Sequence, residues 1–427
     1  MGNIDDTQKK VDESGFADEK EYSFMQETIK DESRSVKKTK KLILKYAGLG
    51  LVFGLASSLG FCALKPLAES VFQKDPEEVT IPVEEEEEEN VSVEETEVIV
   101  DQALTIDNYR ELNRALVQVA DETEKCVVVI SAETEDSQWK SRGYNKKNEV
   151  SGILLADNGQ ELLVFAKTTV LKDALSLRAT FADGKSYSAL VKVKDENLGF
   201  AIFAVKKQDV QDSTMKAVKM ADLGSSNYMS RGDLVIALGS PFGYAEGVGF
   251  GIVASRDNAI KTVDGEYGLL TTDIAGASNG TGVLVNIRGE VVGMIDQSVS
   301  GETGDNLIAA YGITNLKMLM ENLSNGNPVP YIGVKGITIT ETIANEQGIP
   351  QGVYVQEVAA DSPAMEAGIQ SGDIITAMGQ EEVELLSVYT TKLMRYSVGD
   401  KIKIEGQRLG AGGYIDIDFT VTVGSKE

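Results

Sequence analysis

A succession of short apolar runs, separated by glycine-containing turns, fills the chain from residue 126 to residue 295. Each run is rich in Val, Ile and Leu, and together they are Cys126–Ser131, Gly152–Leu155, Leu162–Phe165, Leu175–Phe181, Ser188–Val193, Ala201–Val205, Leu234–Leu238, Gly249–Ala254, Gly282–Val285 and Val291–Ile295. Short strands at this spacing indicate an all-β barrel or sandwich rather than βαβ units. Before them, apolar residues between Leu104 and Ala120 recur at helical spacing and predict one helix.

The N-terminal part contains an apolar stretch at 42–64, with Lys45 as its one charge. Its uncharged portion, 46–64, is close to the roughly 20 residues that an apolar helix needs to cross a bilayer. A core helix of a soluble protein would be destabilised by this density of glycine. The lysines at 37, 38, 40 and 41 precede the stretch, and the positive-inside rule therefore places residues 1–41 in the cytoplasm. This tail is polar and highly charged, so we expect it to be disordered. We therefore expect a single-pass protein of a bacterial cell membrane, with the bulk of the chain extracytoplasmic.

An acidic segment follows at 65–102, and it includes the run Glu84 to Glu89. Like charges extend such a segment, so it is interpreted as a solvated stalk. A calcium site is the alternative, but a contiguous acidic run lacks the spacing of a calcium-binding loop.

The chain has a formal net charge of −26 and contains no histidine. The charge disfavours binding to nucleic acid, and the missing histidine removes the commonest general base from any site. The two cysteines, Cys62 and Cys126, fit no metal-binding pattern. No metal and no cofactor is therefore expected.

A boundary is predicted at Asn325–Pro330, where Gly and Pro cluster. It separates a region at 103–325 from a last block at 328–427, which mixes strands with two short helices. One of these helices begins in Ser362–Gly368 and the other is Glu384–Tyr396.

Several long phrases occur in order along the two regions. They are Leu223-Gly-Ser-Ser-Asn, Arg231-Gly-Asp-Leu-Val-Ile-Ala-Leu-Gly-Ser-Pro-Phe-Gly243, Gly249-Phe-Gly-Ile-Val-Ala-Ser255, Thr272-Asp273, Leu284-Val-Asn-Ile-Arg-Gly-Glu-Val-Val-Gly293, Tyr331-Ile-Gly-Val334 and Ser362-Pro-Ala-Met-Glu-Ala-Gly-Ile-Gln-Ser-Gly-Asp-Ile-Ile375. The first five resemble the second β-barrel of the HtrA (DegP/DegS-like) trypsin-fold serine proteases, and the last two resemble the family's PDZ domain. The resemblance implies a mainly β fold, a trypsin-like double β-barrel followed by an α+β PDZ domain.

The resemblance also locates the family's catalytic triad. The histidine of T-N-x-H-V falls on Thr169, and the aspartate of D-x-x-x-D-[IL]-A falls on Gly199. The serine of G-N-S-G-G falls on Gly280 or Thr281, because the loop is one residue shorter here. None of these positions holds the family's residue. The sequence thus predicts that the chain is not an enzyme but a degenerate member, a pseudoprotease.

An active serine-type endopeptidase with an unorthodox site is the alternative. It would pair Lys167, near the histidine position, with Ser278 in the shortened loop. A lysine base needs burial to lose its proton, and lysines near strands are usually solvated. We therefore expect Lys167 to be solvated.

The PDZ-like block predicts a peptide groove. PDZ domains hold a peptide carboxylate with backbone N–H groups, and the matching loop here is Tyr331, Ile332, Gly333 and Val334. The expected partners are protein C-termini or unfolded segments in envelope quality control, together with active HtrA relatives. The resemblance further implies a possible homotrimer. A structural envelope component without any peptide ligand remains a third interpretation.

Overall fold

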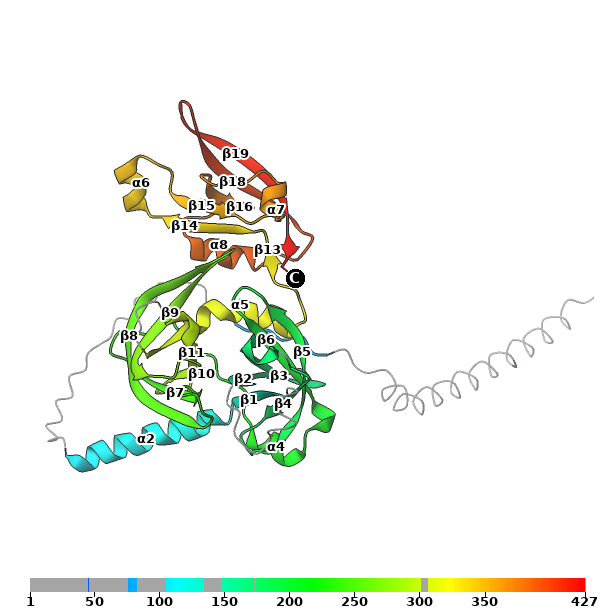
Figure 1. The fold of residues 1–427 in the computed structure, drawn as a ribbon, viewed down its shortest axis with the longest axis vertical. Coiled ribbons are helices and arrows are strands. Elements are labelled where there is room, and N and C mark those ends of the chain that lie inside the picture. The colour runs from blue at the N-terminus through cyan, green and yellow to red at the C-terminus, as the bar shows by residue number, and fades with distance from the viewer. Residues whose placement is uncertain are drawn as a thin grey trace, which may run out of the picture. The chain divides into compact units, whose positions relative to one another are not determined.

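The computed structural model describes residues 45, 76–82, 105–133, 148–172, 174–300 and 306–426 of the chain. The chain divides into two compact units, 1–75 and 76–427, and the second contains the elements given below (Figure 1). Among the described residues, no helix has the length and apolar character that a membrane span requires. The span predicted at 42–64 lies outside the described residues except for Lys45, as do the predicted tail and most of the predicted stalk.

Twelve strands form two closed antiparallel barrels. The first barrel has the strand order β1-β2-β3-β6-β5-β4 and is built from β1 (Val127–Glu133), β2 (Glu149–Asp157), β3 (Glu161–Lys167), β4 (Ser176–Thr180), β5 (Ser186–Asp195) and β6 (Phe200–Lys206). The second has the order β10-β11-β12-β9-β8-β7 and is built from β7 (Leu234–Ser240), β8 (Gly247–Thr262), β9 (Gly265–Ala275), β10 (Thr281–Asn286), β11 (Val291–Asp296) and β12 (Leu307–Gly312). The expected double barrel is confirmed.

Strands that face both a barrel interior and a second layer are buried along nearly their whole length and are mostly apolar. Every residue of β10 and of β11 is buried, and so are all but one of β3 and of β6. Phe165 and Phe200 stack with ring centroids 4.7 Å apart in the core cluster that the two barrels share. This double burial explains why the sequence shows continuous apolar runs instead of alternation.

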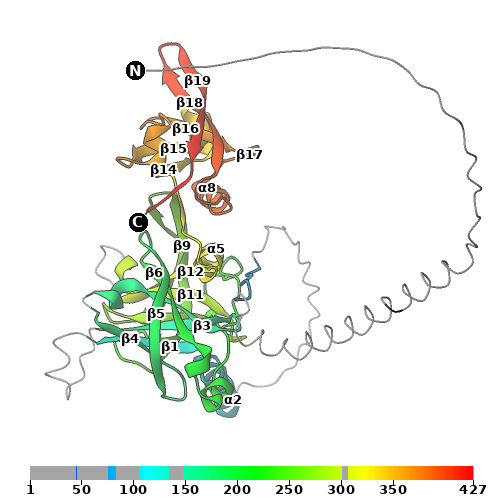
Figure 2. The ribbon, with the colours of Figure 1, turned by 90° about the vertical axis from the view of Figure 1, so that its right-hand side faces the viewer.

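The barrels carry short and long helices. These are α2 (Ile106–Glu124), η2 (Thr168–Leu171), η3 (Lys207–Asp209), α4 (Asp212–Ala217), η4 (Gln297–Val299) and α5 (Ile313–Ser324). Figure 2 shows α5 beside strands of both barrels, and its side chains belong to the shared core. The predicted helix over 104–120 is α2, which begins after the cap Thr105 and continues to Glu124. The sequence analysis missed α5, β9 and β12.

The last block is an open sheet of order β14-β15-β16-β18-β19 with helices packed on it. Its elements are β13 (Pro330–Tyr331), β14 (Val334–Ile339), α6 (Glu341–Gln347), β15 (Gly352–Val358), α7 (Pro363–Glu366), β16 (Ile374–Met378), β17 (Glu381–Glu382), α8 (Leu386–Leu393), β18 (Lys401–Gly410), β19 (Gly413–Thr422) and β20 (Gly424–Ser425). The two predicted helices correspond to α7 and α8. The strand β14 lies at the edge of the sheet, next to α8.

Residues 76–82, which fall within the predicted stalk, lie on the barrels. The backbone of Val79 exchanges two hydrogen bonds with the Asn325 side chain, both 2.8 Å long. The Ile81 N–H donates to Glu321 at 2.9 Å, and the Ile81 side chain is buried. This part of the acidic segment is therefore bound to the end of α5, whereas the sequence predicts a solvated stalk.

Candidate functional site

A cavity of about 240 Å³ lies between the two barrels. Thr169 of η2 lines it from the first barrel, and Ser278, Gly280 and Thr281 line it from the second. Of the four positions that the sequence analysis assigned to the triad, three therefore lie at one cavity. Gly199, the fourth, is adjacent: a Cβ built on it would lie 3.5 Å from the Lys167 ammonium.

Lys167, the last residue of β3, is buried in this cavity, so the prediction that it is solvated is wrong. Its Nζ lies 2.6 Å from Oδ2 of Asp296 and donates to the Leu198 carbonyl oxygen at 2.5 Å. It also lies 4.4 Å from the Phe200 ring centroid. The contact with Asp296 is one of charge, since Oδ2 has no aligned hydrogen bond among the described residues. A buried ammonium is tolerated because a carboxylate and a carbonyl oxygen compensate its desolvation.

The 195–199 turn brings a further carboxyl group close to Lys167. Asp195 accepts hydrogen bonds from the backbone N–H groups of Asn197 and Leu198, and burial raises the pKa of its carboxyl. Gly199 has φ +67°, a conformation that favours glycine. The turn thereby directs the Leu198 carbonyl toward Lys167. Because Gly199 has no side chain, the Lys167 ammonium can lie beside it.

The loop before β10 is closed by its own backbone. The Gly280 N–H donates to the Ala277 carbonyl at 2.8 Å, and the Ala277 N–H donates to the Pro241 carbonyl at 2.9 Å. A Cβ at Gly280 would lie 2.4 Å from the Pro241 oxygen, so no side chain fits there in this conformation. Thr281 is buried, and its hydroxyl oxygen accepts from the Ser151 N–H at 2.9 Å. Ser278 is thus the exposed hydroxyl of the loop.

The second candidate site is the loop at 331–334. The backbone N–H groups of Ile332, Gly333 and Val334 all donate to one carboxylate, at 2.8, 2.6 and 2.9 Å. That carboxylate belongs to Asp264, which is buried. Gly333 has φ +94°, and a Cβ there would lie 2.3 Å from the Ser362 Cβ, so the loop requires glycine at this position. Three backbone N–H groups of the loop therefore hold the Asp264 carboxylate, and peptide binding by the loop stays a prediction.

Asp264 is located at the turn between β8 and β9, a hairpin that reaches α8 and β14 (Figure 1). Its backbone N–H donates to the Val334 carbonyl at 2.6 Å, and the Tyr389 hydroxyl donates to its Oδ1 at 2.7 Å. Burial raises the pKa of the Asp264 carboxyl, an effect that the backbone N–H groups and the Tyr389 hydroxyl oppose. Burial, with the neighbouring Asp264 charge, also raises the pKa of Tyr389.

The sequence analysis missed both Asp264 and Tyr389. The dipeptide Asp264-Gly265 is a turn signal, and with it a hairpin could have been predicted. Nothing in the order of residues indicates that the turn meets a loop about 70 positions later in the chain.

Comparisons with known proteins agree with this geometry. Residues 150–294 match the model of the trypsin-like peptidase domain, and residues 330–419 match that of the PDZ domain. The chain is 28% identical over 284 residues to a probable periplasmic serine protease do/HhoA-like of Haemophilus influenzae, covering 64% of this chain and 59% of the relative. It is 26% identical over 265 residues to the periplasmic serine endoprotease DegP of Escherichia coli K12, covering 60% and 53%. The chain thus spans under two thirds of the length of these relatives.

Solved structures show the same fold. The HtrA-type protease AlgW with a decapeptide matches with a TM-score of 0.53 at 19% identity, over 73% of this chain and 99% of that one. AlgW with a tripeptide matches with a TM-score of 0.54 at 20% identity, over 74% and 97%.

The prediction that this chain is not an enzyme is contradicted by these matches. The middle region matches a peptidase domain, and the similar proteins are named serine proteases. The assignment of Thr169, Gly199, Gly280 and Thr281 to triad positions stays a prediction, as does the role of 331–334 in peptide binding.

Proposed function

The chain belongs to the HtrA family of serine proteases with a PDZ domain, and we propose that it captures protein C-termini or unfolded segments in envelope quality control. Capture takes place at residues 331–334 of the PDZ domain. Envelope quality control fits the periplasmic relatives, whose names place them outside the cytoplasm.

The observation that carries this proposal is the convergence of three backbone N–H groups on a carboxylate. Such a set of donors recognises a carboxylate and no particular side chain, so it suits the one group that every protein C-terminus shares. Beside the loop, β14 is the edge strand of its sheet, where an extended peptide adds as a further strand. Peptide capture therefore needs no group beyond those the loop and strand supply.

Membrane attachment belongs to the same proposal. The apolar stretch at 42–64 would anchor the protein, with 1–41 in the cytoplasm and the domains at 103–325 and 328–427 outside. An anchored capture protein would act at the outer face of the membrane, where exposed C-termini of envelope proteins are present.

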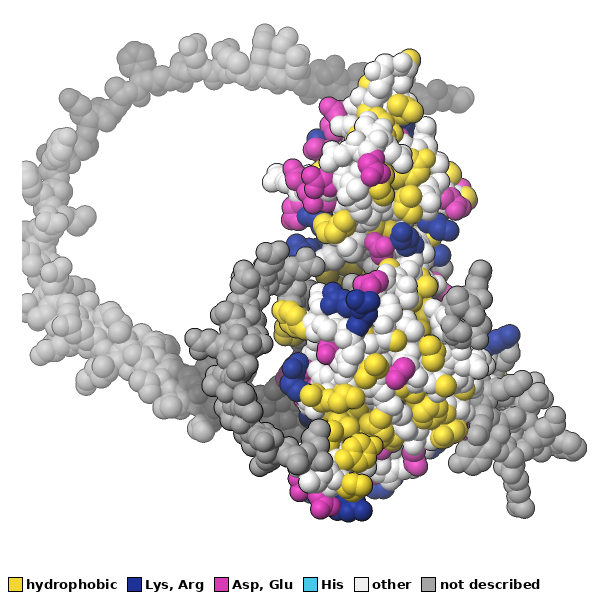
Figure 3. All heavy atoms as spheres, turned by 90° about the vertical axis from the view of Figure 1, so that its left-hand side faces the viewer, with side chains coloured by type: hydrophobic (Ala, Val, Ile, Leu, Met, Phe, Trp, Pro, Cys, Tyr) yellow, Lys and Arg dark blue, Asp and Glu magenta, His cyan; other side chains and the backbone are white. Residues whose placement is uncertain are grey.

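Self-assembly through the second barrel is also part of the proposal. Four large apolar side chains on or near β7 and β8 are exposed: Leu234, Tyr244, Val248 and Phe250. Figure 3 shows hydrophobic side chains gathered on the face that carries these strands. Contiguous apolar surface of this kind suits another protein, and we propose a second copy or an active HtrA relative as the partner.

Peptide capture is tested with the full-length chain and two fluorescent peptides of one apolar sequence, ending in a free carboxylate or in an amide. We expect the acid to bind at least about tenfold more tightly than the amide, since the amide lacks the charge that the N–H groups hold. Gly333→Glu should abolish this preference, and Gly348→Glu, a left-handed position with open space around it, is the matched control. Equal affinity for acid and amide would refute the proposal.

Hydrolysis of peptide bonds in the interbarrel cavity is the second candidate function. The cavity brings together Lys167, Asp296 and the exposed Ser278 hydroxyl. Lysine can accept a proton from serine only when it is neutral, so hydrolysis requires that the pair with Asp296 open. Casein hydrolysis by the full-length chain that Ser278→Ala abolishes and Ser298→Ala leaves intact would support this candidate. If casein hydrolysis is retained in both variants, this second candidate function is rejected.

A further inference from the structure

We propose that Asp264 is the chain's own ligand for the carboxylate-binding loop, and that a peptide C-terminus must displace the β8–β9 hairpin in order to bind. This inference rests on the proposed peptide capture. It concerns how the same site is regulated.

The contacts of Asp264 reproduce those that a bound C-terminal residue makes. A peptide added to an edge strand donates its last N–H groups to that strand and places its carboxylate in the loop. Asp264 does both: its N–H donates to the Val334 carbonyl at 2.6 Å, and its carboxylate accepts from Ile332, Gly333 and Val334. The difference is that the carboxylate is on a side chain and the backbone continues into β9.

All four groups around the carboxylate are donors. Oδ2 accepts from Ile332 and Gly333, and Oδ1 accepts from Val334 and from the Tyr389 hydroxyl. Each oxygen thus has two partners, which is the arrangement that an ionised carboxylate satisfies and that an amide cannot, because the NH₂ group would face donors. The loop is filled by the chemical group it is built to hold.

The turn that delivers Asp264 has a left-handed backbone conformation at this residue. Asp264 has φ +58°, a value that non-glycine residues rarely adopt. Conformations of this kind persist where surrounding contacts over-determine them. Here the hydrogen bonds to the loop add to those of the hairpin in holding that conformation.

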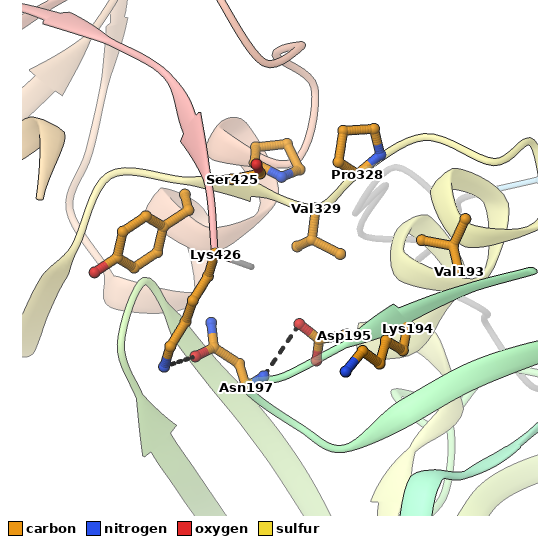
Figure 4. A pocket seen from close by; sticks show the side chains of 10 residues that line it. Val193, Lys194, Asp195, Asn197, Pro328, Val329, Ser425 and Lys426 are labelled. Carbon is orange, nitrogen blue, oxygen red and sulfur yellow. Dashed lines mark hydrogen bonds between the residues drawn. The ribbon is translucent and has the colours of Figure 1, made fainter. Parts of the chain in front are cut away.

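Two further hydrogen bonds hold the hairpin. The Val263 carbonyl accepts from the Asn197 side chain at 3.2 Å, and the Glu266 N–H donates to the Thr390 hydroxyl at 3.0 Å. Asn197 also receives a hydrogen bond from Lys426 (Figure 4).

Next to the loop is a cavity of about 250 Å³. It is lined by Tyr331, Asn197 and Asp195 together with Pro328, Val329 and Lys426 (Figure 4). Asn197 joins this cavity to the hairpin, because it lines the cavity and its side chain donates to the Val263 carbonyl.

An internal ligand lowers the apparent affinity for an external one by the fraction of molecules in which the loop is vacant. A peptide binds well only when its strand contacts, beyond the single residue that Asp264 imitates, outweigh the hairpin's contacts. Extended C-terminal segments are thereby favoured over single carboxylates such as acetate.

The test compares Asp264→Asn with the full-length wild-type chain, using the acid and amide forms of the fluorescent peptide. Removing the competitor should raise affinity for the acid by at least about tenfold, and the amide, which meets the same hairpin, should still bind more weakly than the acid. Asp257→Asn, an exposed position on β8, is the control and should match wild type. If both proteins bind the acid equally and more tightly than the amide, the internal-ligand proposal is wrong and peptide capture stands. If neither protein distinguishes acid from amide, peptide capture itself fails.

A measurement on the wild-type chain removes any dependence on how the variant folds. Hydrogen exchange of residues 262–266 should become faster when the acid peptide saturates the protein, because the turn leaves the loop. Amides 332–334 should remain protected, since the peptide takes over their hydrogen bonds. Unchanged exchange at 262–266 in the saturated protein would overturn the proposal.

Discussion

The interbarrel cavity and the carboxylate-binding loop each contain a buried charged group, and they satisfy it in different ways. In the cavity, Lys167 of β3 meets Asp296 of β11, so two opposite charges are matched inside the double barrel. At the loop, Asp264 meets four neutral donors and no cation among the described residues. A charge pair is lost when either member leaves, whereas a set of neutral donors accepts any carboxylate of the right shape.

The parts of the fold that carry the two charged groups also differ. Lys167 lies against Phe200, which stacks on Phe165 in the core shared by the barrels. Asp264 is carried by a hairpin turn. The comparison indicates that the cavity is locked by its own core, while the loop holds a contact that another molecule can replace.

The largest expected effect is at the cavity. Asp296→Ala leaves the Lys167 ammonium buried without a counter-charge and should lower the free energy of unfolding by about 3–5 kcal/mol. Urea unfolding of the full-length chain measures this. The double variant Lys167→Met, Asp296→Leu should recover most of the loss, because no unpaired charge remains.

The control for this prediction is an exposed ion pair. Asp418→Ala removes one of the two carboxylate partners of Lys403, whose side chain is half exposed, and should lower the free energy of unfolding far less than Asp296→Ala. Similar losses from Asp296→Ala and Asp418→Ala would show that the cavity is not locked by its charge pair.

An intermediate effect is expected at the loop. Tyr389→Phe deletes one hydrogen bond to a charged oxygen, and such bonds are worth about 1.5–3 kcal/mol. Because the loss weakens Asp264 binding as well as folding, thermal stability should fall while affinity for the acid peptide rises. Tyr354→Phe, in β15 of the same domain, is the matched control. A fall in both stability and peptide affinity would mean that Tyr389 serves the external ligand more than the hairpin.

The smallest expected effect of peptide binding is on the barrel core, which the buried thiol of Cys126 reports. Burial raises the pKa of the Cys126 thiol to about 12, which leaves almost no thiolate at pH 8. In a Cys62→Ser background, maleimide should label Cys126 at least about a hundredfold more slowly in the native chain than in urea. Saturating acid peptide should leave that rate unchanged, because only the hairpin moves. Faster labelling with peptide would show that the barrels open too.

Most of the fold could be predicted from residue patterns. The continuous apolar runs are barrel strands, and the glycine-containing phrase at 331–334 is a loop whose N–H groups hold a carboxylate. The prediction failed for Lys167, because a lysine at the end of a strand is usually solvated and its partner Asp296 lies 129 positions away. The β9 strand was missed because Gly268 and the polar residues 271–273 break its apolar residues, so it shows no continuous apolar run.

By itself the sequence determined most of the barrel strands, the glycine that the 331–334 loop requires, and the absence of histidine from every site. These follow from local chemistry, since apolar periodicity and backbone freedom are properties of neighbouring residues. Only the tertiary structure decided that Lys167 is paired with Asp296 and that Asp264 occupies the loop. Each of these contacts joins residues far apart in the chain, and their energies come from desolvation and charge, which exist only once the domains have packed.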